Sequence, residues 1–182
     1  SSRNSRGSDA ISPHTDKGAL PDRSPADLAE LGDALEKTGS PEGAAAAIGA
    51  YARRHPGKRH AWEQLAALRE RQGDLAAAVA VRDEISRRFG PSLASSVELA
   101  RLEWRLGRPR DALAELRRWA GSAGPGEADY WRLLAELAWN EEADDLAGRA
   151  YLALWNGDEI DAVGAERLLL LGRDAGHREE VI

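Results

Sequence analysis

The chain has 182 residues, of which 42% are hydrophobic, a formal net charge of −6, and neither cysteine nor methionine. The lack of cysteine excludes disulfides and thiol chemistry, and the negative charge argues against a nucleic-acid partner. No run of about 18 apolar residues is present, so the sequence predicts no transmembrane segment. Alanine, leucine, glutamate and arginine dominate, which favours helices.

Residues 1–23 differ in composition from the rest of the chain. Serine, arginine, aspartate, glycine and proline prevail there, so we predict a linker or disordered tail. The alternative is a tail that docks on the folded part. Because the sequence begins without methionine and its repeats stop inside a unit, we expect it to be a piece of a longer array.

From residue 24 onward, turn signals alternate with apolar periodicity of three and four residues. Ser24-Pro25 and Ser40-Pro41 are typical of an N-cap followed by proline in the first helical turn. Gly73-Asp74 is typical of one helix ending and the next beginning. The pattern predicts helices over 25–38, 42–54, 59–72, 75–89, 93–106, 109–120, 128–141, 144–156 and 160–175.

The helices repeat with a period of 34 residues. Three sets of equivalent residues show it: Gly39, Gly73 and Gly107; Ala44, Ala78 and Ala112; Leu31, Leu65 and Leu99. A fourth unit follows one residue late, and the insertion falls at Gly124-Pro125-Gly126. Such a period is typical of stacked helical hairpins. We predict one solenoid over residues 24–182, with units 25–58, 59–92, 93–127, 128–161 and a partial unit 162–182.

The repeat resembles the tetratricopeptide repeat (TPR) family. The residues that carry the resemblance in the second unit are Trp62, Leu65, Ala66, Gly73, Asp74 and Ala78. The resemblance covers residues 25–182 and implies an all-α, right-handed superhelical solenoid of about four and a half helix-turn-helix hairpins. Arg82 and Glu142-Ala143 depart from the family pattern, which puts local packing in doubt but not the fold.

Catalytic signals are weak. The four histidines have no second metal ligand at helical spacing, no glycine-rich phosphate loop follows a strand, and nothing groups serine, histidine and aspartate into a triad. We therefore expect no catalytic, cofactor-binding or metal-binding residues, and we expect that the protein is not an enzyme. Arrays of this kind mostly present surfaces to partners.

The six tryptophans are the sharper signal. Trp62 and Trp131 occupy the structural position of the family, and Trp119 and Trp155 fall late in second helices, so we predict that these four pack inside the solenoid.

Trp104 and Trp139 lie elsewhere, in adjacent first helices, at a position that looks toward the concave groove in this family. Two interpretations have equal weight: a recognition surface, or a seal between neighbouring helices. The candidate partner-binding residues are Arg101, Trp104, Arg105, Arg132, Glu136, Trp139, Asn140 and Arg173. The other end of the groove is acidic, through Asp33, Glu36, Glu63 and Glu70, and is either a negative patch or a solvated charged face.

Residues 150–155 and 165–171 also resemble the tetratricopeptide region of PelB-type exopolysaccharide exporters. The resemblance implies a periplasmic scaffold, part of an outer-membrane protein. It would dock a polysaccharide-modifying deacetylase or hydrolase and guide a cationic polysaccharide to an outer-membrane pore.

Two other functions stay open: a cytosolic adaptor that binds a peptide or helix of a protein partner, and a passive spacer. The clamp of lysine and asparagine that chaperone-binding members use is not matched. Its positions are occupied by Ala29, Asp33, Glu63, Ala67 and Arg101.

Overall fold

The computed structural model describes residues 24–179, and these residues contain helices but no strand. The predicted tail, residues 1–23, lies outside the described residues. The helices are α1 (Pro25–Lys37), α2 (Pro41–Arg54), α3 (Arg59–Arg71), α4 (Leu75–Phe89), α5 (Leu93–Arg105), α6 (Pro109–Arg117), α7 (Ala128–Asn140), α8 (Asp144–Asn156) and α9 (Ala162–Glu179). The predicted all-α fold is confirmed.

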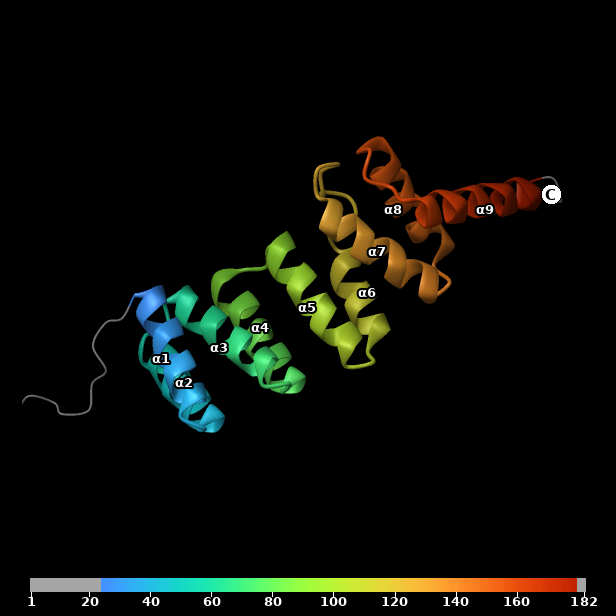
Figure 1. The fold of residues 1–182 in the computed structure, drawn as a ribbon. Coiled ribbons are helices and arrows are strands. Elements are labelled where there is room, and N and C mark those ends of the chain that lie inside the picture. Colours follow the sequence, from blue (N-terminus) through green and yellow to red (C-terminus); the bar gives the residue numbers. More distant parts are fainter. Residues whose placement is uncertain (1–23, 180–182) are drawn as a thin grey trace, which may run out of the picture.

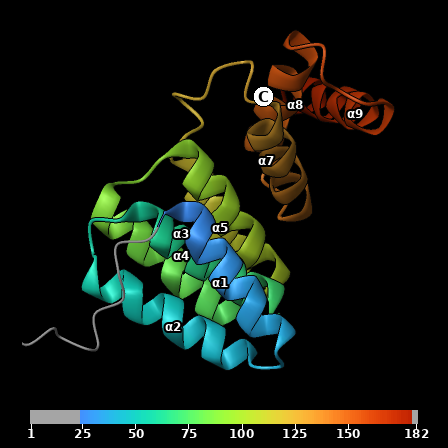
Figure 2. The ribbon, with the colours of Figure 1, turned by 60° about the vertical axis from the view of Figure 1, so that its left-hand side comes forward.

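Successive helices pair as antiparallel hairpins, α1 with α2 through α7 with α8, and each hairpin packs against the next (Figure 1). A second view shows the same order, with α9 at the end of the stack beside α8 (Figure 2). The architecture is therefore a helical-hairpin solenoid.

The turns inside the hairpins form as the glycine spacing predicts. Gly39, Gly73 and Gly107 have φ of 78°, 77° and 73°, the left-handed conformation that glycine adopts without a steric cost. The predicted cap forms at α4, where the Asp74 side chain accepts a hydrogen bond from Ala77 N at 3.1 Å. At α2 the predicted N-cap, Ser40, makes no side-chain capping hydrogen bond. In the fourth unit Glu142 takes the same conformation, with φ of 56°, although it has a side chain.

Small residues let the two helices of each hairpin approach closely. Ala44, Ala78, Ala112 and Ala147 are almost completely buried. Two rows of leucines pack on Ala44, Ala78 and Ala112 from the first helix of the next unit, and all are buried: Leu65, Leu99 and Leu134, and Leu68, Leu102 and Leu137. The same hydrophobic seam therefore repeats through the solenoid.

Three of the four tryptophans predicted to pack are covered. Trp62 and Trp131 are 6% and 4% exposed. Trp119 is half-buried, and its Nε1 donates to Ser96 Oγ at 2.9 Å. The prediction was wrong for Trp155, which is 59% exposed. Its equivalent one unit earlier is Ala120, so a large indole extends outward from a site that elsewhere holds a small side chain.

Two helix ends differ from the predicted ones by more than two residues. α6 ends at Arg117 rather than at residue 120, because the chain turns at Trp119, whose carbonyl accepts from Ala123 N at 2.8 Å. α9 continues to Glu179 instead of ending at residue 175 before Gly176. A glycine inside a helix costs only about 1 kcal/mol relative to alanine, so a glycine alone does not end a helix.

Candidate partner-binding surface

The predicted partner-binding residues all lie on first helices of the hairpins. Arg101, Trp104 and Arg105 are on α5, Arg132, Glu136, Trp139 and Asn140 on α7, and Arg173 on α9. We call the surface formed by these positions and their equivalents on α1 and α3 the inner face. The structure shows that these residues differ sharply in what they contact.

Ion pairs link consecutive first helices at the start of the inner face. Arg71 on α3 pairs with Asp33 and Glu36 on α1, at 3.1 and 2.9 Å. One unit on, Arg105 on α5 pairs with Glu70 on α3. In each case an arginine late in one first helix reaches an acid at an equivalent position on the preceding one.

This series stops between α5 and α7. The position of Glu36 and Glu70 is taken by Trp104 in the third unit, and the position of Arg71 and Arg105 is taken by Asn140 in the fourth. Trp104 is 37% exposed, and Asn140 is exposed as well. An aromatic surface thus replaces a salt bridge at one step of the repeat.

Trp139, the equivalent of Trp104 one unit later, is held by its neighbours. The Arg167 guanidinium of α9 lies over its ring, with Cζ 5.0 Å from the ring centre. Arg167 Nη1 also reaches Glu136 Oε1 and Tyr151 Oη, both at 2.8 Å. The Tyr151 ring meets Trp139 edge to face, with centres 6.4 Å apart. Trp139 therefore seals the packing of α7, α8 and α9.

A shallow cavity of about 300 Å³ opens beside Trp104, between α5 and α7. Its lining residues are Arg101, Trp104, Asp129, Arg132, Leu133 and Glu136. Arg132 is paired with Asp129 at 3.4 Å and with Glu159. Arg101 is exposed and has no carboxylate within salt-bridge distance among the described residues. The structure brings together Arg101, Trp104, Arg132 and Glu136 of the predicted set around this cavity.

Each of the acids at the other end of the inner face is paired with an arginine. Asp33 and Glu36 share Arg71, Glu70 pairs with Arg105, and Glu63 accepts from Arg59 Nε at 2.8 Å. The structure therefore does not support the alternative of an open negative patch there.

Sequence reasoning missed a carboxyl group between α4, α5 and α6. The pKa of Glu103 is raised to about 7, chiefly by burial and also by the charges of Asp111, Asp83 and Glu115, while Arg108 acts to lower it. One oxygen of the carboxylate, Oε2, is buried without a hydrogen-bond partner. The acids come from three helices, so only a substitution in the pattern, Glu103 where Arg69 stands one unit earlier, hints at the site.

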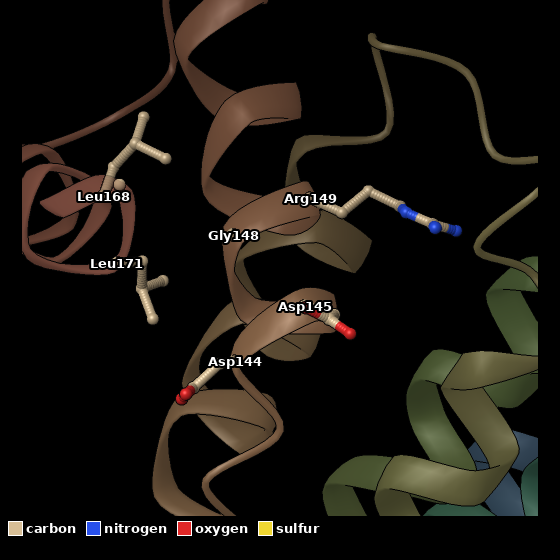
Figure 3. A pocket seen from close by; sticks show the side chains of 7 residues that line it. Asp144, Asp145, Gly148, Arg149, Leu168 and Leu171 are labelled. Carbon is tan, nitrogen blue, oxygen red and sulfur yellow. The ribbon is translucent and has the colours of Figure 1, made fainter. Parts of the chain in front are cut away.

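A second cavity, of about 260 Å³, lies between α8 and α9 (Figure 3). Leu168 and Leu171 of α9 point toward α8 there, and Asp144 lies at the start of α8. The equivalent leucines of an earlier unit, Leu65 and Leu68, are buried against α2 of the preceding hairpin. Leu168 and Leu171 are only half-buried where they pack against the hydrophobic core, and the adjacent Leu169 is 75% exposed.

Within residues 24–179, no group of three or more histidine, aspartate or glutamate side chains has the arrangement of a metal site. None of the helices described has both the length and the apolar character needed to cross a membrane.

Comparison with known proteins identifies the class. The tetratricopeptide repeat family profile matches residues 84–181, and a second profile of the same description matches residues 29–91. The chain belongs to the tetratricopeptide repeat family, and its repeats make it a protein-interaction scaffold. No curated protein matches the chain.

Solved structures share the fold at low identity. MamA, residues 41 to the end, from Desulfovibrio magneticus RS-1 has a TM-score of 0.62 at 18% identity, over 85% of this chain and 88% of that one. YrrB, a TPR protein with an unusual peptide-binding site, has a TM-score of 0.63 at 14% identity, over 87% and 81%. TTC0263, a thermophilic TPR protein of Thermus thermophilus, has a TM-score of 0.52 at 20% identity, over 82% and 81%. These similarities concern the fold alone.

Proposed function

We propose that the chain is a non-catalytic scaffold that binds a segment of a protein partner on the inner face between α5 and α7, with Trp104 as the main contact. One observation carries the proposal: Trp104 is 37% exposed, beside a cavity, at the step where the ion-pair series is interrupted. Interface hot spots are enriched in tryptophan and arginine seated in pockets, and Arg101 and Arg132 flank this one.

The packing of Trp139 makes it a poorer candidate for a partner contact than Trp104. A ring that already contacts Arg167 and Tyr151 offers little unsatisfied surface to a partner. The ring of Trp104 has no aromatic or cation–π partner among the described residues, so a ligand would supply the missing contacts. The description of YrrB as a TPR protein with an unusual peptide-binding site supports a peptide as the ligand.

The finer biological role that we propose is a periplasmic one, in Pel-type exopolysaccharide secretion. Here the scaffold would dock a polysaccharide-modifying deacetylase or hydrolase and help guide the polymer to an outer-membrane pore. The likeness of residues 150–155 and 165–171 to PelB-type exporters supports this role. The alternative is a cytosolic adaptor that binds a peptide or helix of another protein partner.

Affinity capture tests both levels of the proposal. Periplasmic and cytosolic extracts would be applied separately to the wild-type chain, Trp104→Ala and Trp155→Ala. Trp155→Ala is the matched control, because Trp155 is also exposed but lies on α8. We expect a periplasmic polysaccharide deacetylase or hydrolase to be retained by the wild type and by Trp155→Ala, but not by Trp104→Ala. A cytosolic protein with the same dependence would replace the export role by the adaptor. Equal retention by all three would place the binding surface elsewhere.

A further inference from the structure

The charges around the Trp104 cavity indicate what kind of segment it takes. Arg132 is satisfied by Asp129 and Glu159, and Glu136 is satisfied by Arg167. Arg101 is the exception among the charged lining residues, since no described carboxylate lies within salt-bridge distance of it. The site therefore has one cation that its own structure does not neutralise.

The apolar part of the cavity lies on the same side of α5. Arg101 and Trp104 are three residues apart, which places them as neighbours on one helical face. Leu133 of α7, which is buried, forms part of the lining next to them. A ligand that covers this spot meets an exposed indole, an aliphatic surface and an unpaired guanidinium together.

We infer that the cavity recognises a peptide segment that presents a carboxylate beside an apolar side chain. The aspartate or glutamate pairs with Arg101, and the apolar side chain covers Trp104 and Leu133. This inference rests on the proposed peptide-binding function and adds the chemistry of the ligand. Arginine suits this role because its planar guanidinium gives two parallel hydrogen bonds to a carboxylate.

The same charges disfavour the polysaccharide at this position. A partly deacetylated amino-sugar polymer is cationic, and at the cavity it would approach an unpaired guanidinium of the same sign. Tryptophan rings also stack on sugars, so a chitosan oligomer, which is a chain of glucosamine units, is the competing probe.

A selection experiment with a charge reversal tests the inference. A phage library of random 12-residue peptides, a length of about 40 Å when extended, is selected on wild-type chain, on Arg101→Glu, on Trp104→Ala, and on Arg117→Glu. The last variant is the matched control, because Arg117 is an exposed arginine on α6, away from the inner face. Circular dichroism of each variant confirms that the helices are intact.

We expect wild type and Arg117→Glu to enrich peptides with aspartate or glutamate next to a leucine, phenylalanine or proline. Arg101→Glu should instead enrich lysine or arginine at that place, and Trp104→Ala should lose the enrichment. The best wild-type peptide should bind Arg101→Glu at least tenfold more weakly, because the change removes the charge-assisted pair and sets two carboxylates against each other.

Three results would overturn the inference. If wild type and Arg101→Glu select the same peptides through Trp104, the chemistry is wrong but the proposed peptide site stands. If the selected peptides bind Trp104→Ala as well as wild type, the proposed site fails too. If a chitosan oligomer binds wild type and not Trp104→Ala, the cavity takes a sugar rather than a peptide.

Discussion

The Arg167 guanidinium on α9 lies over the Trp139 ring on α7, with Cζ 5.0 Å from the ring centre. The same arginine reaches Glu136 and Tyr151, so it joins three helices at one point. This contact distinguishes Trp139 from Trp104, although the two occupy equivalent positions of the repeat.

Replacement of Arg167 by alanine should loosen α9. The change removes a cation–π contact and two hydrogen bonds from a half-buried guanidinium and leaves Glu136 and Tyr151 without that partner. We expect a loss of about 1–3 kcal/mol in unfolding free energy. Relative to the wild type, hydrogen exchange in Arg167→Ala should become faster in α9 but not in α3 or α4. Arg110→Ala is the control, because the Arg110 side chain is 91% exposed and its salt bridge to Glu141 should contribute less than about 1 kcal/mol.

Replacement of Glu142 by glycine should stabilise the fourth hairpin. Glu142 has φ of 56° at the position where earlier units have glycine. A left-handed conformation costs a residue with a side chain roughly 1–2 kcal/mol, and glycine removes that cost while adding freedom to the unfolded chain. We expect a net gain of about 1 kcal/mol in urea unfolding. The converse change, Gly107→Ala, should destabilise by a similar amount, although no atom lies within 4 Å of the added Cβ. If Glu142→Gly and Gly107→Ala had the same effect on the free energy of unfolding, this account of the turns would be contradicted.

Stability should fall as pH rises toward and past 7, through Glu103. Its pKa in the folded chain is raised from 4.5 to about 7, so between these values the folded state holds a proton that the unfolded state releases. The stabilising effect of that proton is complete below about pH 4.5 and is lost as pH passes through about 7. Glu103→Gln should therefore flatten the decrease in Tm between pH 5 and pH 8, because its amide stays neutral. A remaining slope is expected from Asp83, whose pKa burial also raises. An unchanged slope in Glu103→Gln would assign the effect to other groups.

Enlarging Ala78 should weaken one junction rather than the whole array. Ala78 is completely buried in the seam of the second unit, so Ala78→Leu overpacks it at a cost of about 1–3 kcal/mol. Because each unit contacts only its neighbours, α7 and α8 should keep their hydrogen-exchange protection while α3, α4 and α5 lose it. A single loss of protection in all helices would show that the array unfolds as one unit.

The sequence predicted the helices and turns well because the repeat supplies the same signal several times. The glycine turns, the buried alanines and the tryptophans at the structural position were all expected, and the structure confirms them. The two interpretations of the groove tryptophans could not be separated from the sequence. The deciding residue, Arg167, lies in the next unit, 28 residues after Trp139, and its reach depends on packing.

Other features escaped sequence reasoning for related reasons. Trp155 occupies a position that is half-buried one unit earlier, and only the structure shows that a larger side chain there extends into solvent. The raised pKa of Glu103 depends on acids from α4 and α6 that are up to 20 residues away. The sequence contains both the acids on α1 and α3 and the arginines that pair with them. It does not show the pairing, which depends on how neighbouring helices pack.

The central claim is that Trp104 is the main contact for a partner, and a direct binding measurement tests it. The peptide selected by the wild-type chain would be titrated by calorimetry against wild type, Trp104→Ala and Trp155→Ala. Since hot-spot residues cost more than about 1–2 kcal/mol when truncated, we predict that Trp104→Ala binds at least tenfold more weakly. Trp155→Ala should bind like the wild type. Equal affinity of Trp104→Ala and wild type would contradict the account and place the binding surface away from the inner face.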